Sequence, residues 1–385
     1  MTPGARVAAA IEILDAIVAG QPAEQTLTRW ARGNRFAGSK DRAAIRDHVF
    51  DALRHWRSDA LRGGGVTGRA RMIGRMRAAG LHLDAVFDGV GHAPPPLSAA
   101  ERAAGQAPET QGDQWDMPDW LVRTFEDSLG DSAEATAMAL SERAPVTLRV
   151  NTARTDVAAA RIALASDGVE TAPNARAASA LTVIEGPRRV RGARAFNEGL
   201  VELQDASGQA AIAQLTGQGR ALDYCAGGGG KALALAAQGW TVSAHDINPS
   251  RMRDLPERAA RGGHMIEVLA ADAVGHSAPF DLVLCDAPCS GAGTWRRAPE
   301  AKWTLTPARL DDLVALQRSV LQSAAPLVAR TGVLAYATCS ILRDENEVQI
   351  DWFLAANPDW DVLSVTRWPV DDLGDGFFLA QLARR

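Results

Sequence analysis

The sequence is poor in cysteine, and its few cysteines are unevenly placed. None occurs in the first 224 residues, and none has the Cys-x-x-Cys spacing typical of zinc sites and redox motifs. We therefore expect neither a disulfide framework nor a bound metal. The four cysteines are Cys225, Cys285, Cys289 and Cys339.

Long apolar runs are also missing. No stretch approaches the length of a membrane span, and the N-terminus lacks the apolar core of a signal peptide. These two absences predict a cytoplasmic protein with no membrane partner. The chain contains no internal repeat and no low-complexity tail, and its 385 residues predict two or three domains.

The net charge of −5 argues weakly against a nucleic-acid partner, but the charge is unevenly distributed. Residues 1–80 hold 14 Lys or Arg and 7 Asp or Glu, so they carry +7 and the remainder carries −12. A basic segment on an acidic protein indicates a polyanion-binding surface. A solvated, Arg-rich helical surface explains the same charge equally well.

Residues 1–112 are predicted to form a helical domain and a linker. An apolar stripe at helical spacing indicates a first helix, and residues 39–57 form a second amphipathic helix. Residues 92–113 are rich in Pro, Ala and Gly, which is typical of a linker or a long loop. The stripe consists of Val7, Ile11, Leu14 and Val18.

Residues 113–204 are predicted to form a small α/β subdomain. Strands are expected at 146–151 and 180–186, with a helix at 156–168 between them. Four arginines follow within residues 187–196. We slightly favour a phosphate contact for these arginines over a solvated hairpin.

Residues 205–385 alternate between strands and helices, which predicts a doubly wound α/β sheet. Most of the strands are nearly continuous apolar runs, as expected where helices cover both faces. Such sheets bind ligands beyond the carboxyl ends of their strands. The expected strands are residues 220–225, 241–247, 266–272, 280–286, 332–339, 361–368 and 376–383.

A glycine-rich loop follows the first of these strands, in the sequence DYCAGGGGKA. Gly227–Ala232 fits the dinucleotide pattern G-x-G-x-x-A, whereas a Walker loop is disfavoured because Lys231 precedes alanine instead of Ser or Thr. The next three strands end in Asp246, Asp272 and Asp286. Together, these acids favour a cationic cofactor that contains ribose, with S-adenosylmethionine ahead of NAD.

Cys289 and Cys339 each lie just past the carboxyl end of a strand, where this architecture places its active site. A thiolate that adds to C6 of a pyrimidine pushes electron density onto C5, which can then accept a methyl group. This chemistry requires a reactive cysteine, an acid near N3 and a group that assists release, for which Cys339, Asp286 and Cys289 are the candidates. For Cys225 and Cys285 we expect the role of small buried hydrophobes.

Several motifs resemble those of the RNA cytosine-C5 methyltransferases of the Sun/RsmB type, in the NOP/Sun superfamily. The resemblance runs from about Pro118 to the C-terminus, and residues 39–57 are more loosely similar to the NusB-like domain of these enzymes. It implies a class I methyltransferase fold, which is Rossmann-like, with a small RRM-like subdomain and an N-terminal NusB-like domain. The motifs are APVTLRVN, FNEGLVELQDASGQAA, DYCAGGGGK, HDINPSRM, DAPCSG followed by RRAPEAKW, YATCSILRDENE and DGFFLAQL.

The resemblance also implies residue roles. Cys339 matches the nucleophile that attacks C6, Cys289 the cysteine that assists breakdown of the adduct, and Asp286 the acid beside it, assigned to the cofactor or the base. Asp246 matches the residue at the cofactor ribose, and Asp272 the residue at its adenine. The substrate implied is cytosine in small-subunit (16S) ribosomal RNA. The S-adenosylmethionine loop corresponds to Cys225, Ala226, Gly227, Gly228, Gly229, Gly230 and Lys231.

The chain departs from the family in the loop, which usually reads CAAPGGK followed by Thr. Gly227 and Gly228 replace Ala and Pro, and Ala232 replaces Thr, so the loop has more freedom to lose on binding. We expect the loop still to bind the cofactor, with weaker affinity. The helical domain also looks shortened between residues 80 and 115.

Three cations follow Cys289 closely and are predicted to hold RNA backbone phosphates: Arg296, Arg297 and Lys302. The neighbouring Trp295 and Trp303 are expected to pack instead of stacking on bases. Two other functions stay open: an NAD-dependent oxidoreductase that uses the glycine pattern, and a catalytically silent RNA-binding protein of the same fold. We expect a monomer.

Overall fold

The computed structural model describes residues 1–385, which divide into two compact units. The helical unit comprises Met1–Arg143 and Trp295–Thr304, and the α/β unit comprises Ala144–Thr294 and Leu305–Arg385. No helix in either unit is long and apolar enough to cross a bilayer.

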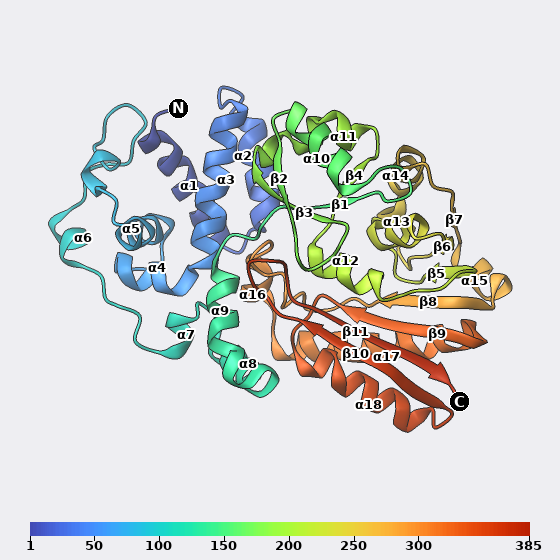
Figure 1. Ribbon diagram of the computed structural model, residues 1–385. Helices are drawn as coiled ribbons and strands as arrows, with labels where there is room; N and C mark the ends of the chain where they lie inside the picture. The colour runs from blue at the N-terminus through green and yellow to red at the C-terminus, as the bar shows by residue number, and fades with distance from the viewer. The chain divides into compact units, whose positions relative to one another are not determined.

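The helical unit packs around α1, α2, α3 and α5 (Figure 1). The Thr2 side chain accepts a hydrogen bond from the Ala5 N–H at 3.2 Å and so caps α1. Val7 and Leu14 of the expected stripe are buried, whereas Val18 is 43% exposed at the end of the helix. The helices are α1 (Pro3–Val18), α2 (Ala23–Gly33), α3 (Ser39–Arg54), α4 (Trp56–Gly63), α5 (Gly68–Ala78), α6 (Ala99–Ala103), α7 (Gln111–Gln114), α8 (Asp119–Leu129), α9 (Ala133–Ser141) and α16 (Glu300–Thr304), with 3-10 turns at Leu83–Ala85 and Gly130–Ser132.

The single helix predicted for residues 39–57 is two helices, because the chain leaves helical geometry at His55. The buried carboxylate of Asp116 explains the break. It accepts the backbone N–H groups of Arg57 and Ser58, each at 2.9 Å, and thereby satisfies donors at the start of α4. The sequence of α3 and α4 alone gives no hint of this distant acceptor.

The helical unit extends past the predicted boundary at residue 112. Helices α8 and α9 belong to it, and so does the segment Trp295–Thr304, which comes from much later in the chain. Trp295 is 1% exposed and stacks on Phe125 at 5.9 Å, which confirms that it packs. Trp303 donates its indole N–H to the Leu53 carbonyl at 2.7 Å.

The α/β unit begins with a small antiparallel sheet of order β2-β3-β1-β4. Two of its strands lie where the sequence predicts them, while β2 and β4 are too short to stand out as apolar runs. The helix α10 covers one face through Ala160 and Leu164. The strands are β1 (Thr147–Val150), β2 (Glu170–Pro173), β3 (Ala180–Glu185) and β4 (Val201–Leu203), and the helices are α10 (Val157–Ser166), a 3-10 turn (Pro187–Gly192) and α11 (Arg194–Asn197).

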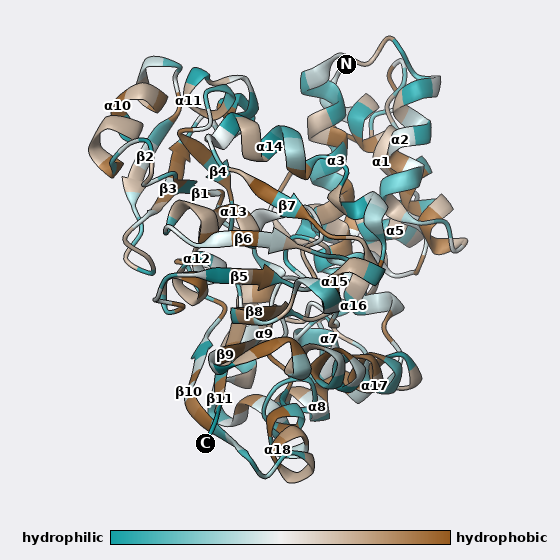
Figure 2. Ribbon diagram, turned by 90° about the vertical axis from the view of Figure 1, so that its right-hand side faces the viewer, coloured by the Kyte–Doolittle hydropathy of each residue, from teal (hydrophilic) through white to brown (hydrophobic).

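The larger sheet has seven strands in the order β10-β11-β9-β8-β5-β6-β7. Strands β9, β8, β5, β6 and β7 run parallel, and β10 and β11 add an antiparallel edge. The hydropathy colouring of Figure 2 shows apolar residues along β8 and β9, as predicted for buried strands. The strands are β5 (Arg220–Asp223), β6 (Thr241–Ala244), β7 (Ile266–Val268), β8 (Phe280–Asp286), β9 (Val328–Thr338), β10 (Trp360–Trp368) and β11 (Phe377–Arg384).

Alternate residues of β8 contribute to two separate cores, one on each face of the sheet. Leu282 and Leu284 pack with the helices α12, α13 and α14, whereas Val283 and Cys285 pack with α17 and α18. This is the two-sided covering expected of a doubly wound sheet. The helices are α12 (Ala206–Ala213), α13 (Gly230–Ala237), α14 (Leu255–Gly262), α15 (Ala271–Ser277), α17 (Pro307–Ala324) and α18 (Glu347–Ala356), with 3-10 turns at Pro249–Met252, Ala325–Leu327 and Arg343–Glu345.

Candidate active site

Three neighbouring parallel strands bring the predicted site residues to one edge of the large sheet. Asp223 at the end of β5 is in register with Leu284 of β8, and Asp286 at the end of β8 is in register with Ala337 of β9. The carboxyl ends of the three strands are therefore nearly level. The glycine loop leaves the sheet at this edge, and so do the two loops that carry Cys289 and Cys339, which we call the sulfur-bearing loops. Asp286 lies at the same edge.

The glycine loop is tightly folded, and two of its glycines are required by its conformation. Gly227 has φ +52° and Gly229 has φ +80°, values that L side chains rarely adopt. A Cβ on Gly229 would also lie 2.2 Å from Leu255 Cδ1. The loop ends at Gly230, where α13 begins, so the backbone N–H groups of the first helical turn lie next to the loop.

Asp246, the predicted ribose acceptor, is 2% exposed and hydrogen-bonds to backbone around it. Its Oδ2 accepts the Gly227 N–H at 2.9 Å and pairs with Arg251 at 3.1 Å. Its Oδ1 accepts the Asn248 N–H at 2.9 Å. The carboxylate thus fixes the position of the glycine loop in addition to any contact with a ligand.

Asp272 is not the last residue of a strand, contrary to the sequence prediction. Strand β7 ends at Val268, and Asp272 lies exposed in the first turn of α15. The apolar run predicted as one strand is divided because Leu269 turns inward and packs beside Val274. Its role toward the adenine stays a prediction.

Lys231 and Asp286 form an ion pair at the carboxyl ends of β5 and β8. Lys231 Nζ lies 2.6 Å from Asp286 Oδ2 and 5.2 Å from the centre of the Phe377 ring. Burial works against the charged form of Lys231, but the charge and hydrogen bond of Asp286 outweigh it, with a further contribution from the Cys339 sulfur. The pKa of Lys231 is therefore raised above its usual value.

Asp223, which we did not predict as a site residue, is a fully buried carboxylate at the end of β5. It is 0% exposed, and neither oxygen makes a well-aligned hydrogen bond. Burial, reinforced by the charge of Asp286, raises its pKa to about 7. A buried acid without a well-aligned hydrogen bond is costly, so a cationic ligand close to it would stabilise its ionised form. The signal in the sequence was its position two residues before the glycine loop.

Cys289 and Cys339 meet at the same edge, with their sulfur atoms 3.4 Å apart. The hydrogen bond to Cys339 raises the pKa of Cys289 well above its usual value, and burial and the nearby charges of Cys339 and Glu345 add to the shift. Cys289 therefore keeps its proton while Cys339 is free. Cys285 is fully buried, as expected, and Cys225 is partly buried against the same core.

Glu345, also missed by the sequence reasoning, joins the two sulfur-bearing loops. It is 0% exposed, and it accepts the Ser290 N–H at 2.8 Å, the Ser290 hydroxyl at 2.5 Å and the Gln317 amide at 3.0 Å. Tyr336 donates to the Glu345 carbonyl at 2.7 Å. The carboxylate so holds the loop after Cys289 against the segment that follows Cys339.

The three cations predicted to hold RNA phosphates belong to the helical unit, and two of them are buried. Arg296 is 3% exposed and Lys302 is 2% exposed, whereas Arg297 is exposed. Burial lowers the pKa of Lys302 to about 8, with the charge of Asp116 opposing the shift. The expectation of accessible phosphate contacts is wrong for Arg296 and Lys302, because their side chains pack in the interior.

The residues present fit S-adenosylmethionine, the cofactor favoured by the sequence. The buried Asp223 carboxylate, whose oxygens lack a well-aligned hydrogen bond, suits a ligand that carries positive charge, and the tight glycine loop lets a ligand approach the backbone closely. Asp246 lies at the end of β6, where such sheets hold ribose. A doubly anionic pyrophosphate would gain nothing from Asp223.

Two family models match the chain. The family described as 16S rRNA methyltransferase RsmB/F matches residues 210–383, and the ferredoxin-like domain of RsmF/B-like methyltransferases matches residues 117–191. Among solved structures, the protein PH0851 aligns with a TM-score of 0.77 at 24% identity, covering 100% of this chain and 99% of its own. A methyltransferase homologue from Pyrococcus horikoshii aligns with a TM-score of 0.61 at 23% identity, over 71% of this chain and 97% of its own.

Curated relatives named ribosomal RNA small subunit methyltransferase B match most of the chain. The Pasteurella multocida protein is 34% identical over 69% of this chain and 65% of its own length. The Cronobacter sakazakii protein is 32% identical over 71% of this chain and 68% of its own length. The Pectobacterium atrosepticum protein is 28% identical over 91% of this chain and 92% of its own. The first of these alignments thus spans just under two thirds of the relative.

Proposed function

Because the chain belongs to the RsmB/F family of 16S rRNA methyltransferases, we propose that it transfers a methyl group from S-adenosylmethionine to C5 of a cytosine in small-subunit ribosomal RNA. One observation carries the chemistry: the sulfur atoms of Cys289 and Cys339 lie 3.4 Å apart, beside the ion pair of Lys231 and Asp286. The target base must enter this site single-stranded or flipped out of a duplex.

Cys339 is assigned as the nucleophile. Its thiolate adds to C6 of the cytosine, the C5=C6 double bond opens, and N3 takes up a proton. The ammonium group of Lys231 lies close enough to the Cys339 sulfur for that sulfur to contribute to the raised pKa of Lys231. When bound, S-adenosylmethionine supplies the electrophilic methyl group that C5 accepts.

The proton for N3 is assigned to the pair of Lys231 and Asp286 instead of Asp286 alone. The 2.6 Å contact is that of an ammonium group donating to a carboxylate, so Lys231 carries the proton in the resting state. The carboxylate orients the ammonium group. The proton returns to this pair when the methylated base is released.

Cys289 is assigned to breakdown of the adduct. While Cys339 is free, its hydrogen bond and charge help to keep Cys289 protonated. Once the Cys339 sulfur is bonded to C6, it carries no charge, and the pKa of Cys289 falls. Cys289 then gives up its proton to solvent, the resulting thiolate removes the C5 proton, the C5=C6 double bond re-forms, and Cys339 leaves as a thiolate.

Two substitutions test these roles with labelled S-adenosylmethionine and small-subunit RNA. Cys339→Ala should abolish turnover, while Cys289→Ala should accumulate a protein–RNA adduct that survives denaturation. Cys285→Ala is the matched control, because its sulfur lies on β8 but packs in the core. Normal turnover without an adduct in Cys289→Ala would refute its role.

Two further measurements separate the alternative functions. An NAD-dependent oxidoreductase would be stabilised against heat by NAD and not by S-adenosylmethionine. A silent RNA-binding protein would bind RNA without forming labelled 5-methylcytidine, which nucleoside analysis of the product detects.

A further inference from the structure

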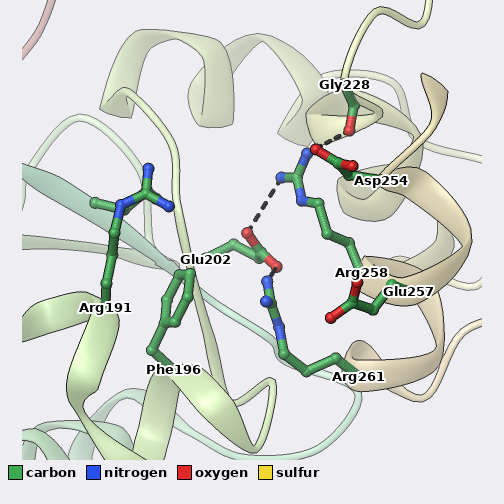
Figure 3. Close-up of a pocket in the computed structure, with 9 residues that line it drawn as sticks. Arg191, Phe196, Glu202, Gly228, Asp254, Glu257, Arg258 and Arg261 are labelled. Atoms are coloured by element: carbon green, nitrogen blue, oxygen red, sulfur yellow. Dashed lines mark hydrogen bonds and ion pairs between the residues drawn. The ribbon is translucent and has the colours of Figure 1, made fainter. Parts of the chain in front are cut away.

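A cavity of about 420 Å³ lies within the α/β unit, on the side of the glycine loop that faces the helix α14 (Figure 3). Gly228 of the loop, Glu202 of β4, and Arg258 and Arg261 of α14 are among its lining residues. The cavity thus joins the small sheet, α14 and the cofactor loop. The side chains of Glu202, Arg258 and Arg261 have no part in the chemistry proposed above.

Arg258 connects the loop to the small sheet. One of its terminal nitrogens, Nη1, donates a hydrogen bond to the Gly228 carbonyl. The other, Nη2, lies 3.1 Å from Glu202 Oε2, so the guanidinium spans the distance between the loop and β4 (Figure 3). A guanidinium has a rigid, planar arrangement of donors, so fixing one nitrogen orients the other.

Glu202 is itself held in place. It is 8% exposed, and its second oxygen accepts a hydrogen bond from Arg261. Arg261 in turn lies over the ring of Phe196 at 4.5 Å. Two arginines on one buried carboxylate leave Arg258 little freedom to swing away from Gly228.

The loop needs such a restraint at Gly228. The neighbouring Gly227 N–H is held by Asp246, and the Gly229 N–H donates to the Ala226 carbonyl at 2.8 Å. Four consecutive glycines, residues 227–230, otherwise have more backbone freedom than any other residues. Arg258 restrains the Gly228 carbonyl that lies between these two fixed N–H groups.

We propose that Arg258, oriented by Glu202, is a positioning residue that pre-organises the glycine loop for the cofactor. This inference rests on the proposed function, because it assigns the loop to S-adenosylmethionine. The loop then meets its ligand already ordered, and the small sheet helps to set cofactor affinity through Glu202.

The first test measures S-adenosylmethionine affinity by calorimetry. Arg258→Met should weaken binding about tenfold, because fixing the backbone of a residue or so is worth roughly that factor. Glu202→Gln should weaken it less, and Arg258→Lys, which keeps one donor, should recover part of the loss. Arg253→Met is the matched control, since this nearby arginine is 82% exposed and should leave affinity unchanged.

A second test needs no cofactor. Amide hydrogen exchange across residues 225–231 of the free protein should be faster in Arg258→Met than in the wild type. Adding Gly228→Ala to this variant should slow the exchange and restore affinity, because alanine restricts the loop. A Cβ at Gly228 meets only Arg258 Nη1, at 3.3 Å, and the first substitution removes that atom.

The outcomes separate the two proposals. A wild-type protein that binds no S-adenosylmethionine would end the proposed function, while exchange in the free loop would still decide the role of Arg258. A wild type that binds normally, with unchanged affinity and loop exchange in Arg258→Met, would overturn the positioning role. A lower melting temperature with unchanged affinity would likewise reduce Arg258 to a structural contact.

Discussion

Binding of S-adenosylmethionine should depend on pH through Asp223, and the structure sets the size of the effect. The carboxyl is fully buried and has a pKa of about 7, so it is mostly protonated at pH 6 and mostly ionised at pH 8. The nearby charges are those of Asp286 and Asp246, which raise the pKa, and of Lys231, which lowers it. The Ala232 N–H offsets part of the shift.

A cationic ligand selects the ionised form of Asp223. With a pKa of about 7, roughly one molecule in eleven is ionised at pH 6 and ten in eleven at pH 8, so affinity should rise about tenfold between these pH values. Calorimetry at pH 6, 7 and 8 measures the change. Asp223→Asn should bind S-adenosylmethionine weakly and with a much flatter pH dependence. Any pH dependence that remains in this variant comes from other groups, including those of the ligand, and is subtracted from that of the wild type.

Ionisation of Asp223 should strengthen cofactor binding but lower the stability of the free protein. Its folded-state pKa lies above its unfolded value of 3.8, so the stability that it contributes is present at low pH and is lost as pH rises through about 7. Between pH 5 and 7 the free energy of unfolding should fall by about 2 kcal/mol more in the wild type than in Asp223→Asn. The reasoning would be refuted if the wild type and Asp223→Asn showed the same pH dependence of S-adenosylmethionine affinity and the same pH dependence of the free energy of unfolding.

Three further substitutions probe other parts of the structure. Glu345→Gln should lower kcat at least tenfold and leave S-adenosylmethionine affinity unchanged, because it disturbs the loop after Cys289; steady-state kinetics measures this, and a change in affinity alone would contradict it. Gly229→Ala should destabilise the fold by about 1–3 kcal/mol and impair cofactor binding, since φ is +80° and the Cβ meets Leu255; an unchanged urea midpoint would show that the loop adapts. Lys302→Met should leave RNA affinity unchanged in a binding assay, because the side chain is buried; a large loss of affinity in a stably folded variant would restore Lys302 as a phosphate contact.

The parts of the fold that could be predicted depend on local patterns. The apolar run of β8 and the glycine loop both identify their structures from neighbouring residues alone. The meeting of Cys289 and Cys339 was also predictable, because the carboxyl ends of adjacent parallel strands lie at one edge of a sheet.

The features that could not be predicted depend on partners that are distant in the sequence. The break at His55 is explained by Asp116, and the burial of Lys302 by packing within the helical unit. Asp223 looks like an ordinary strand residue until its lack of partners is seen, and Glu345 acts through Ser290 on another loop. In each case the sequence shows the residue but not what surrounds it.

The segment Trp295–Thr304 begins six residues after Cys289, yet it is built into the helical unit. Its Trp295 and Lys302 are interior residues whose neighbours include Phe125 and Asp116. The chain therefore passes between the two units three times, and removing residues 1–143 would expose the ring of Trp295, which packs on Phe125 in the intact unit. A protein that begins after residue 143 would therefore keep residues 295–304 without the helices on which they pack.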